Sequence, residues 1–215
     1  MKTRKTLLLV LPIALVAGCS NPADSVPKAS VSSITNAPTE AAKPVAVGAA
    51  SRSYVFGPEN SSIQFVGSKV TGRHNGGFRK FSGELRAENG RLADAGNHVT
   101  IDTTSLWADN DRLTGHLKSP DFFNVAQIPT ATFETVAITL QATNSLVTGD
   151  LTLHRVTKRI SFPAQIQVTD EAVEVGAEFF INRFDFDIKY PGKANDLIRK
   201  EVVLKLKVKA SRAQG

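Results

Sequence analysis

The fold class is decided by the stretch Gly149-Asp-Leu-Thr-Leu-His-Arg-Val-Thr-Lys-Arg-Ile-Ser-Phe-Pro-Ala-Gln-Ile166. Leu151 and Leu153 alternate with polar residues, and every second residue from 160 to 166 is again apolar. Two alternating segments joined by a short polar step predict a β-hairpin with one apolar and one solvated face. Because a lone hairpin cannot bury its apolar face, further strands are expected to cover it.

The rest of the globular sequence repeats this alternation. We expect strands at residues 63–65, 78–87, 99–103, 131–140, in both arms of the hairpin, and at 173–181 and 202–208. Residues 109–119 differ, because Leu113 and Leu117 are four apart and Pro120 follows, which predicts one short helix. Eight strands with one or two short helices predict an all-β fold, an eight-stranded antiparallel barrel wide enough for one small ligand.

Phenylalanine is the dominant aromatic residue of the chain. There are 12 Phe against two Tyr and one Trp, and Phe65, Phe133, Phe162 and Phe179 fall on predicted inward positions. This pattern predicts an apolar lumen.

The N-terminus has the pattern of an export signal. Basic residues precede an apolar run at 7–16, which ends in Val16-Ala-Gly-Cys19, a lipobox sequence. We expect a lipoprotein signal peptide at 1–18 and a lipid on Cys19, the alternative being an ordinary signal peptide with a coincidental Cys. The protein is then expected to be exported and anchored by lipid to the bacterial envelope. Because Ser20 and not Asp follows Cys19, the expected location is the outer membrane, facing the periplasm.

The remaining chain divides at a change of composition. Residues 19–53 are rich in Ala, Pro, Ser, Thr and Val, which predicts a lipidated Cys followed by a disordered linker. The barrel domain is expected at 54–211. Cys19 is the only cysteine of the sequence, so no intramolecular disulfide is expected.

The net charge gives little support for nucleic-acid binding. The formal charge is +6, and loss of three basic residues with the signal peptide leaves 23 basic and 20 acidic residues, about +3. These basic residues are spread over the predicted strands, so no nucleic-acid partner is expected.

Three ordered motifs resemble a known family. Residues 76–83 read G-x-F-x-x-F-x-G, residues 116–123 read His-Leu-Lys-Ser-Pro-Asp-Phe-Phe with Ile-Pro-Thr-Ala-Thr-Phe at 128–133, and residues 149–158 open the hairpin. Together they resemble the YceI-like family of lipid- and polyisoprenoid-binding proteins, over about residues 54–210. The resemblance implies a lipocalin-like barrel that holds a polyisoprenoid, isoprenoid quinone or fatty-acyl lipid, with no catalytic reaction and no other cofactor.

The sequence departs from the family pattern near the predicted barrel rim. Family members often have His where Asn60 stands, and another His where Ser68 and Lys69 stand. The Gly of the family's hairpin turn is Arg155 here. These changes affect the expected head-group contacts more than the apolar lumen.

The candidate ligand-binding residues are apolar and are assigned to the lumen. They are Phe65, Phe78, Phe81, Ile101, Leu117, Phe122, Phe123, Phe133, Leu151, Leu153, Phe162, Phe179 and Leu204. His74 and His116 are candidate head-group contacts, although His116 could instead bridge the helix to a strand. Phe122 and Phe123 could cap the core or form a lid over the barrel mouth.

Catalytic and metal sites are not predicted. His74, His98, His116 and His154 show no close metal-ligand spacing. No motif links a Ser or Cys to a His and an acid, so we expect no enzyme. The leading hypothesis is a tethered carrier of an apolar lipid, and the alternative is a ligand-free structural or adaptor domain of the envelope. The oligomeric state, a homodimer included, is left open.

Overall fold

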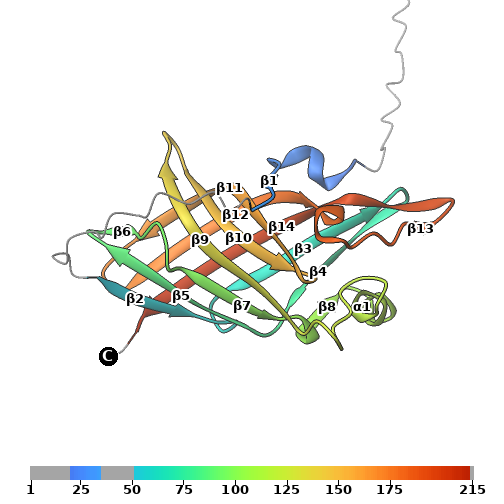
Figure 1. The fold of residues 1–215 in the computed structure, drawn as a ribbon, viewed down its shortest axis with the longest axis horizontal. Coiled ribbons are helices and arrows are strands. Elements are labelled where there is room, and N and C mark those ends of the chain that lie inside the picture. The colour runs from blue at the N-terminus through green and yellow to red at the C-terminus, as the bar shows by residue number, and fades with distance from the viewer. Residues whose placement is uncertain (1–19, 35–50, 214–215) are drawn as a thin grey trace, which may run out of the picture.

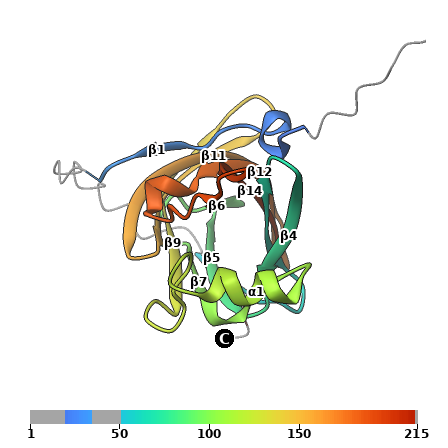
Figure 2. The same ribbon diagram turned by 90° about the vertical axis from the view of Figure 1, so that its right-hand side faces the viewer.

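The computed structural model describes residues 20–34 and 51–213. Its main strands form a closed antiparallel ring (Figures 1 and 2). The ring runs through β2 (Arg52–Phe56), β5 (Phe81–Glu88), β7 (His98–Asp102), β9 (Thr130–Leu140), β10 (Ser145–Leu153), β11 (Val156–Val168), β12 (Ala172–Asn182) and β14 (Asp196–Arg212), which pairs with β2 again. The prediction of an eight-stranded antiparallel barrel is confirmed.

Further strands lengthen the wall at one end, on the right in Figure 1. The long strand β14 pairs with β2 at Ser211 and Arg212 and with β3 (Ser62–Lys69) nearer its start. β3 pairs with β4 (Gly72–Phe78), and β4 pairs with β8 (Leu106–Ala108). Two short strands, β6 (Arg91–Leu92) and β13 (Gly192–Lys193), pair with β5 and β14.

The helix α1 (Asp111–Lys118) lies across the lower edge of this lengthened end (Figure 2). The side chain of Asn110 caps it by accepting a hydrogen bond from the Leu113 N–H at 3.0 Å. The helix ends before Ser119 and Pro120, within the range predicted from the sequence. Two short 3-10 helices connect strands that are consecutive in the sequence: η2 (Thr103–Ser105) follows β7, and η3 (Arg183–Phe186) follows β12.

The hairpin that decides the fold is β10–β11. Leu153 pairs with Val156, so the turn consists of His154 and Arg155 alone, with φ of 51° and 64°. A two-residue turn with positive φ at both positions matches the right-handed twist of the strands and favours glycine. The positive φ at Arg155 explains why the family pattern described above has glycine where Arg155 stands in this chain.

The strand prediction was incomplete: the short strands β6, β8 and β13 were not predicted, and two longer regions also differ. Residues 78–87 were expected as one strand, but Arg79 and Lys80 form a connection between the end of β4 and the start of β5. β2 and most of β4 were not predicted, because β4 contains glycine and polar residues in place of β-branched ones.

The prediction of a disordered linker at 19–53 is wrong for residues 22–32. They form η1 (Pro22–Ser25) and β1 (Ser30–Ser32), and the segment Ser20–Ser33 is here termed the N-terminal strap. β11 and β12 pair only over Gln165–Val168 and then separate. The strap fills the gap: β1 pairs antiparallel with β11, while Lys28 forms a parallel bridge to Phe180 of β12.

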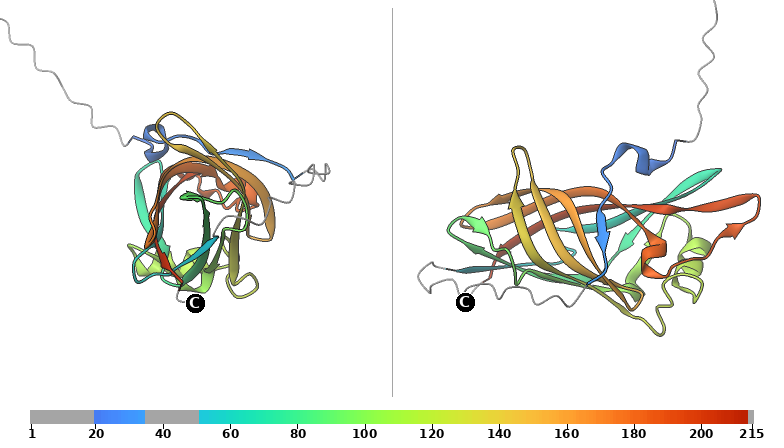
Figure 3. Two further views of the ribbon diagram at one scale, coloured as in Figure 1. Left: turned by 90° about the vertical axis from the view of Figure 1, so that its left-hand side faces the viewer. Right: turned by 45° about the horizontal axis from the view of Figure 1, so that its top comes forward.

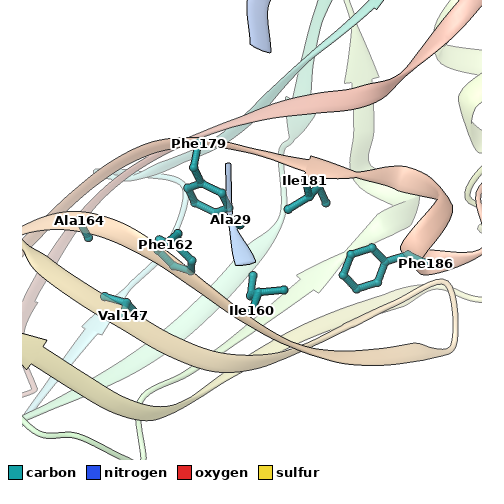
Figure 4. Packing of buried hydrophobic residues seen from close by; sticks show 8 residues of the cluster. All are labelled: Ala29, Val147, Ile160, Phe162, Ala164, Phe179, Ile181 and Phe186. Carbon is teal, nitrogen blue, oxygen red and sulfur yellow. The ribbon is translucent and has the colours of Figure 1, made fainter. Parts of the chain in front are cut away.

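Ala29 is the most deeply buried residue of the strap, with no exposed surface. Figure 4 shows it between Phe179 and Ile181 of β12 and Ile160 and Phe162 of β11. Its N–H donates to the Phe180 carbonyl at 2.9 Å, and the Phe180 N–H donates to the Pro27 carbonyl at 3.0 Å. The composition of the strap does not predict an ordered structure. The strap is ordered because it pairs with the two strand edges that β11 and β12 leave open. The expected signal peptide, Cys19 and residues 35–50 lie outside the described residues.

A cluster of buried apolar residues around Tyr54 packs at the end of the barrel away from α1, which is the left end in Figure 3 (right). Tyr54 is fully buried there, and its hydroxyl donates to the Thr169 carbonyl at 2.8 Å. Asn97 is also buried, and its side chain bonds to the Arg86 N–H, the Ala93 carbonyl and the Thr135 hydroxyl. Because its polar groups are satisfied, this end can close without water.

Candidate ligand-binding lumen

The barrel encloses a cavity of about 500 Å³ whose lining is mainly apolar. This volume lies within the range of small-molecule binding sites, roughly 300–1,000 Å³. The lining comes from the inward faces of the ring strands, and from β3, β4 and the α1 region at the lengthened end.

The structure places nearly all the predicted ligand-binding residues on this cavity. The lining includes Phe65, Phe78, Ile101, Leu117, Phe122, Phe123, Phe133, Leu151, Leu153, Phe162, Phe179 and Leu204, together with His74 and His116. Phe81 does not line it. Phe81 packs instead against Phe56, with ring centroids 6.3 Å apart, and Phe56 takes the lining position. That these residues contact a ligand stays a prediction.

Several large apolar side chains of the lumen are only half-buried. Leu151, Leu153, Phe133 and Leu204 face inward, yet none is covered to the degree of Phe162, which is 3% exposed. In a fully packed barrel such residues would interdigitate and lose their accessible surface. The lumen therefore retains apolar surface that is not filled by the protein's own side chains.

Aromatic rings line the cavity in two groups. Phe162 stacks on Phe179 with centroids 4.1 Å apart and contacts Phe133 at 5.8 Å. Nearer to α1, Phe78 contacts Phe65 at 6.1 Å and Phe123 at 5.9 Å. Both groups contribute apolar rings to the lining of the cavity.

Two glycines of the motif at 76–83 make room for lumen rings. A Cβ atom at Gly76 would lie 2.3 Å from the Phe65 ring, and one at Gly83 would lie 2.2 Å from the Phe56 ring. Gly76 pairs with Phe65 and Gly83 with Phe56 on the neighbouring strands. Each Phe thus lies over a glycine, which explains the glycines of the motif by close packing.

Replacing Gly83 by Ala is expected to lower the free energy of unfolding by about 1–3 kcal/mol, because the methyl group must displace the buried Phe56 ring. Gly67→Ala is the matched control, since a Cβ there meets no atom within 4 Å. Urea unfolding of both variants measures the difference. Equal stability of the two would contradict this packing.

A cluster of three rings lines the cavity beside α1. His116 packs edge-on against Phe122 at 5.1 Å and Tyr190 at 4.9 Å, and its Nε2 lies 2.9 Å from Asp121 Oδ2. His116 therefore links the helix to the loop that follows it and to the segment after η3. Phe122 is 5% exposed, so it packs into the wall and also lines the cavity. Tyr190 was not identified from the sequence.

The most unusual polar residue of the lining is Arg183, which is 4% exposed. Its guanidinium donates to the carbonyls of Ile188 at 2.6 Å, Tyr190 at 2.7 Å and Arg199 at 3.1 Å. Burial lowers the pKa of Arg183 from its ordinary value. Arg183 therefore ties η3 to the start of β14. It was not identified from the sequence.

Further charged groups line the cavity at the lengthened end of the barrel, which is here termed the mouth. Lys69 forms an ion pair with Asp196, and the hydrogen bond from Lys69 keeps the pKa of Asp196 below its ordinary value. His74 lies on the lining with its Nδ1 2.8 Å from Asp109 Oδ1. The lumen therefore has a polar opening and an apolar interior, an arrangement suited to an amphipathic or wholly apolar chain.

Two negative observations apply to residues 20–34 and 51–213. Within these ranges no group of three or more His, Cys, Asp or Glu residues is placed to hold a metal ion. Nor do they include a helix long and apolar enough to cross a bilayer.

The fold and cavity define a class of protein, a small closed β-barrel with an apolar lumen. Within that class the chain belongs to the YceI-like domain family, which matches residues 54–210. The sequence resemblance to this family is thereby confirmed.

Individual relatives agree with this assignment. The chain is 37% identical over 91 residues to a UPF0312 protein of Vibrio parahaemolyticus and 35% identical over 91 residues to YceI of Escherichia coli. Each match covers 42% of this chain and 48% of the relative, so the chain spans about half the length of these relatives.

Solved structures share the fold. Burkholderia cenocepacia BcnA superposes with a TM-score of 0.65 at 22% identity, covering 71% of this chain and 98% of that one. A polyisoprenoid-binding domain of Saccharophagus degradans, implicated in plant cell wall breakdown, superposes with a TM-score of 0.60 at 18% identity, covering 75% and 99%.

Proposed function

We propose that this protein binds one long apolar ligand, a polyisoprenoid, isoprenoid quinone or fatty-acyl lipid, inside its barrel, and carries or sequesters it. The observation that supports this most is the unfilled apolar surface of the lumen, at Leu151, Leu153, Phe133 and Leu204. Exposed apolar surface inside a protein is unfavourable unless something covers it. The polyisoprenoid-binding domain of similar fold supports the same ligand class.

The proposal is of a binding protein and not of an enzyme. The functional residues are apolar rings and aliphatic side chains, which contribute affinity but no proton transfer or nucleophile. The bound lipid would be cargo, with no separate cofactor.

We further propose that the mature protein is a lipoprotein of the bacterial envelope, held at the outer membrane on its periplasmic side by lipid on Cys19. The support is the lipobox Val16-Ala-Gly-Cys19 after an apolar core. A diacylated residue anchors a protein stably, whereas a single chain does so only marginally.

Both parts of the proposal are tested on protein purified from its native host. Native mass spectrometry and organic extraction are expected to reveal a prenyl or acyl lipid held without a covalent bond, and the N-terminal peptide is expected to carry acyl groups on Cys19. The matched Cys19→Ala chain should lose the acyl mass and leave the membrane fraction. Delipidated protein that binds no prenol or fatty acid would favour the alternative of a structural or adaptor domain.

A further inference from the structure

The rim of the barrel mouth presents apolar side chains to solvent. Val70, in the β3–β4 turn, is 55% exposed, and Leu197, at the start of β14, is 51% exposed. The Val70 N–H bonds to the Leu197 carbonyl at 3.3 Å, so the two residues are neighbours. Figures 1 and 3 show these two hairpins projecting together beyond the rest of the wall.

Positive charge surrounds this apolar pair. Arg73, Lys193 and Lys200 are exposed, and none forms an ion pair with a carboxylate among residues 20–34 and 51–213. The nearby Asp196 is paired with Lys69, and Asp109 with His74. Two carboxylates in this region form no ion pair among the described residues: Glu201, half-buried in β14, and Asp111, exposed at the start of α1 two residues after Asp109. The rim is therefore apolar at its tip, with three exposed cations beside it that form no ion pair within the described residues.

The N-terminal strap places the start of the chain on the same part of the wall. In η1, Ala23 packs against Val66 of β3 and Val203 of β14. Val66 is four residues from Val70, about 13 Å along a strand. Residue 19 is one peptide bond before Ser20, so a lipid there would enter a bilayer beside the rim.

We propose that this rim, defined by Val70, Leu197, Arg73, Lys193 and Lys200, contacts an anionic phospholipid surface. Exposed apolar side chains insert into the headgroup region, and the cations pair with lipid phosphates. Lys69, His74 and Lys193 line the cavity at this end of the barrel, and we infer from these polar residues that the lumen opens at the rim. An apolar ligand could then pass between bilayer and lumen with little exposure to water. The position of the lipid anchor beside the rim rests on the proposed function, whereas the contact between the rim and a phospholipid surface does not.

The test uses a chain truncated to begin at Ser20, which retains every described residue and lacks the proposed lipid attachment position, Cys19. Cosedimentation is measured with vesicles of phosphatidylcholine alone and with added phosphatidylglycerol. The chain is expected to bind the anionic vesicles preferentially. Lys200→Gln, at a residue that does not line the cavity, should weaken this binding about fivefold, since each cation near an anionic surface contributes about fivefold. Val70→Ser with Leu197→Ser should weaken it on both vesicle types.

Matched variants at other exposed positions serve as controls. Lys207→Gln and the double variant Val55→Ser with Leu140→Ser remove the same residue types away from the rim, and should change vesicle binding less than twofold. Equal effects of rim and control variants, or equal binding of the wild type to both vesicle types, would overturn the proposal. Prenol binding in solution should be unchanged in all variants. If the wild type binds vesicles as expected but no prenol, the carrier function fails and the rim surface stands.

Discussion

Leu151→Trp is expected to weaken binding of a long prenol at least 100-fold while leaving the barrel folded. Leu151 is half-buried on the lumen, and an indole there would occupy space that the ligand requires. The added ring gains apolar contacts within the cavity, so the melting temperature should stay level or rise. Loss of binding without loss of stability separates a ligand site from a packed core.

The wild type should show a matching dependence on ligand length. Each buried methylene contributes about 0.8 kcal/mol, so each added isoprene unit should strengthen binding about tenfold or more, after the cost of ordering the chain, until the lumen is full. Salt should have little effect. His116→Ala should change affinity less than tenfold, because one hydrogen bond contributes about 1 kcal/mol.

Calorimetric titration with prenols of increasing length, beside melting curves, measures these effects. Leu140→Trp is the matched control, because Leu140 is 60% exposed at the end of β9 and is not on the cavity lining. Constant affinity across the prenol series, or equal behaviour of the two Trp variants, would refute the carrier function.

Ala29→Asp is expected to lower the free energy of unfolding by about 3–5 kcal/mol. The substitution places a carboxylate with no cationic partner among Ile160, Phe162, Phe179 and Ile181. To avoid this cost the strap must leave the wall, which frees the edges of β11 and β12. Hydrogen exchange should then lose protection at the Phe180 amide, which bonds to the Pro27 carbonyl.

Ser30→Asp is the control for this variant. Ser30 is the next residue and is exposed, so the same charge there should change stability by less than about 0.5 kcal/mol. Chemical denaturation gives the stabilities, and exchange monitored by NMR gives the protection of Phe180. Similar results for the two variants would show that the strap contributes no part of the wall.

The sequence predicted the parts of the fold that depend on local alternation. Strands β9 to β12 and β14 carry apolar residues at most alternate positions, so their inward faces could be predicted from the sequence. The lumen residues Phe133, Leu151 and Phe179 were predicted in this way. The resemblance to the YceI-like family then supplied the ligand class, which alternation alone does not contain.

The missed features depend on contacts between distant segments. The strap lacks an apolar period of its own, and its order comes from the gap between β11 and β12, more than 100 residues away. Arg183 was missed because a buried guanidinium requires backbone carbonyls that only the folded η3 and β14 supply. Phe81 alternates correctly, yet Phe56 from the unpredicted strand β2 takes the lining position.

The cluster of buried residues around Tyr54 fills one end of the barrel, which leaves the end beside α1 as the route into the lumen. A ligand cannot be threaded through a barrel filled at one end, and must leave by the route it entered. A linear lipid would go in tail first, with its head group remaining at the mouth throughout its residence. Delivery by this protein would therefore be a handover at one site, in which donor and acceptor take turns at the same opening.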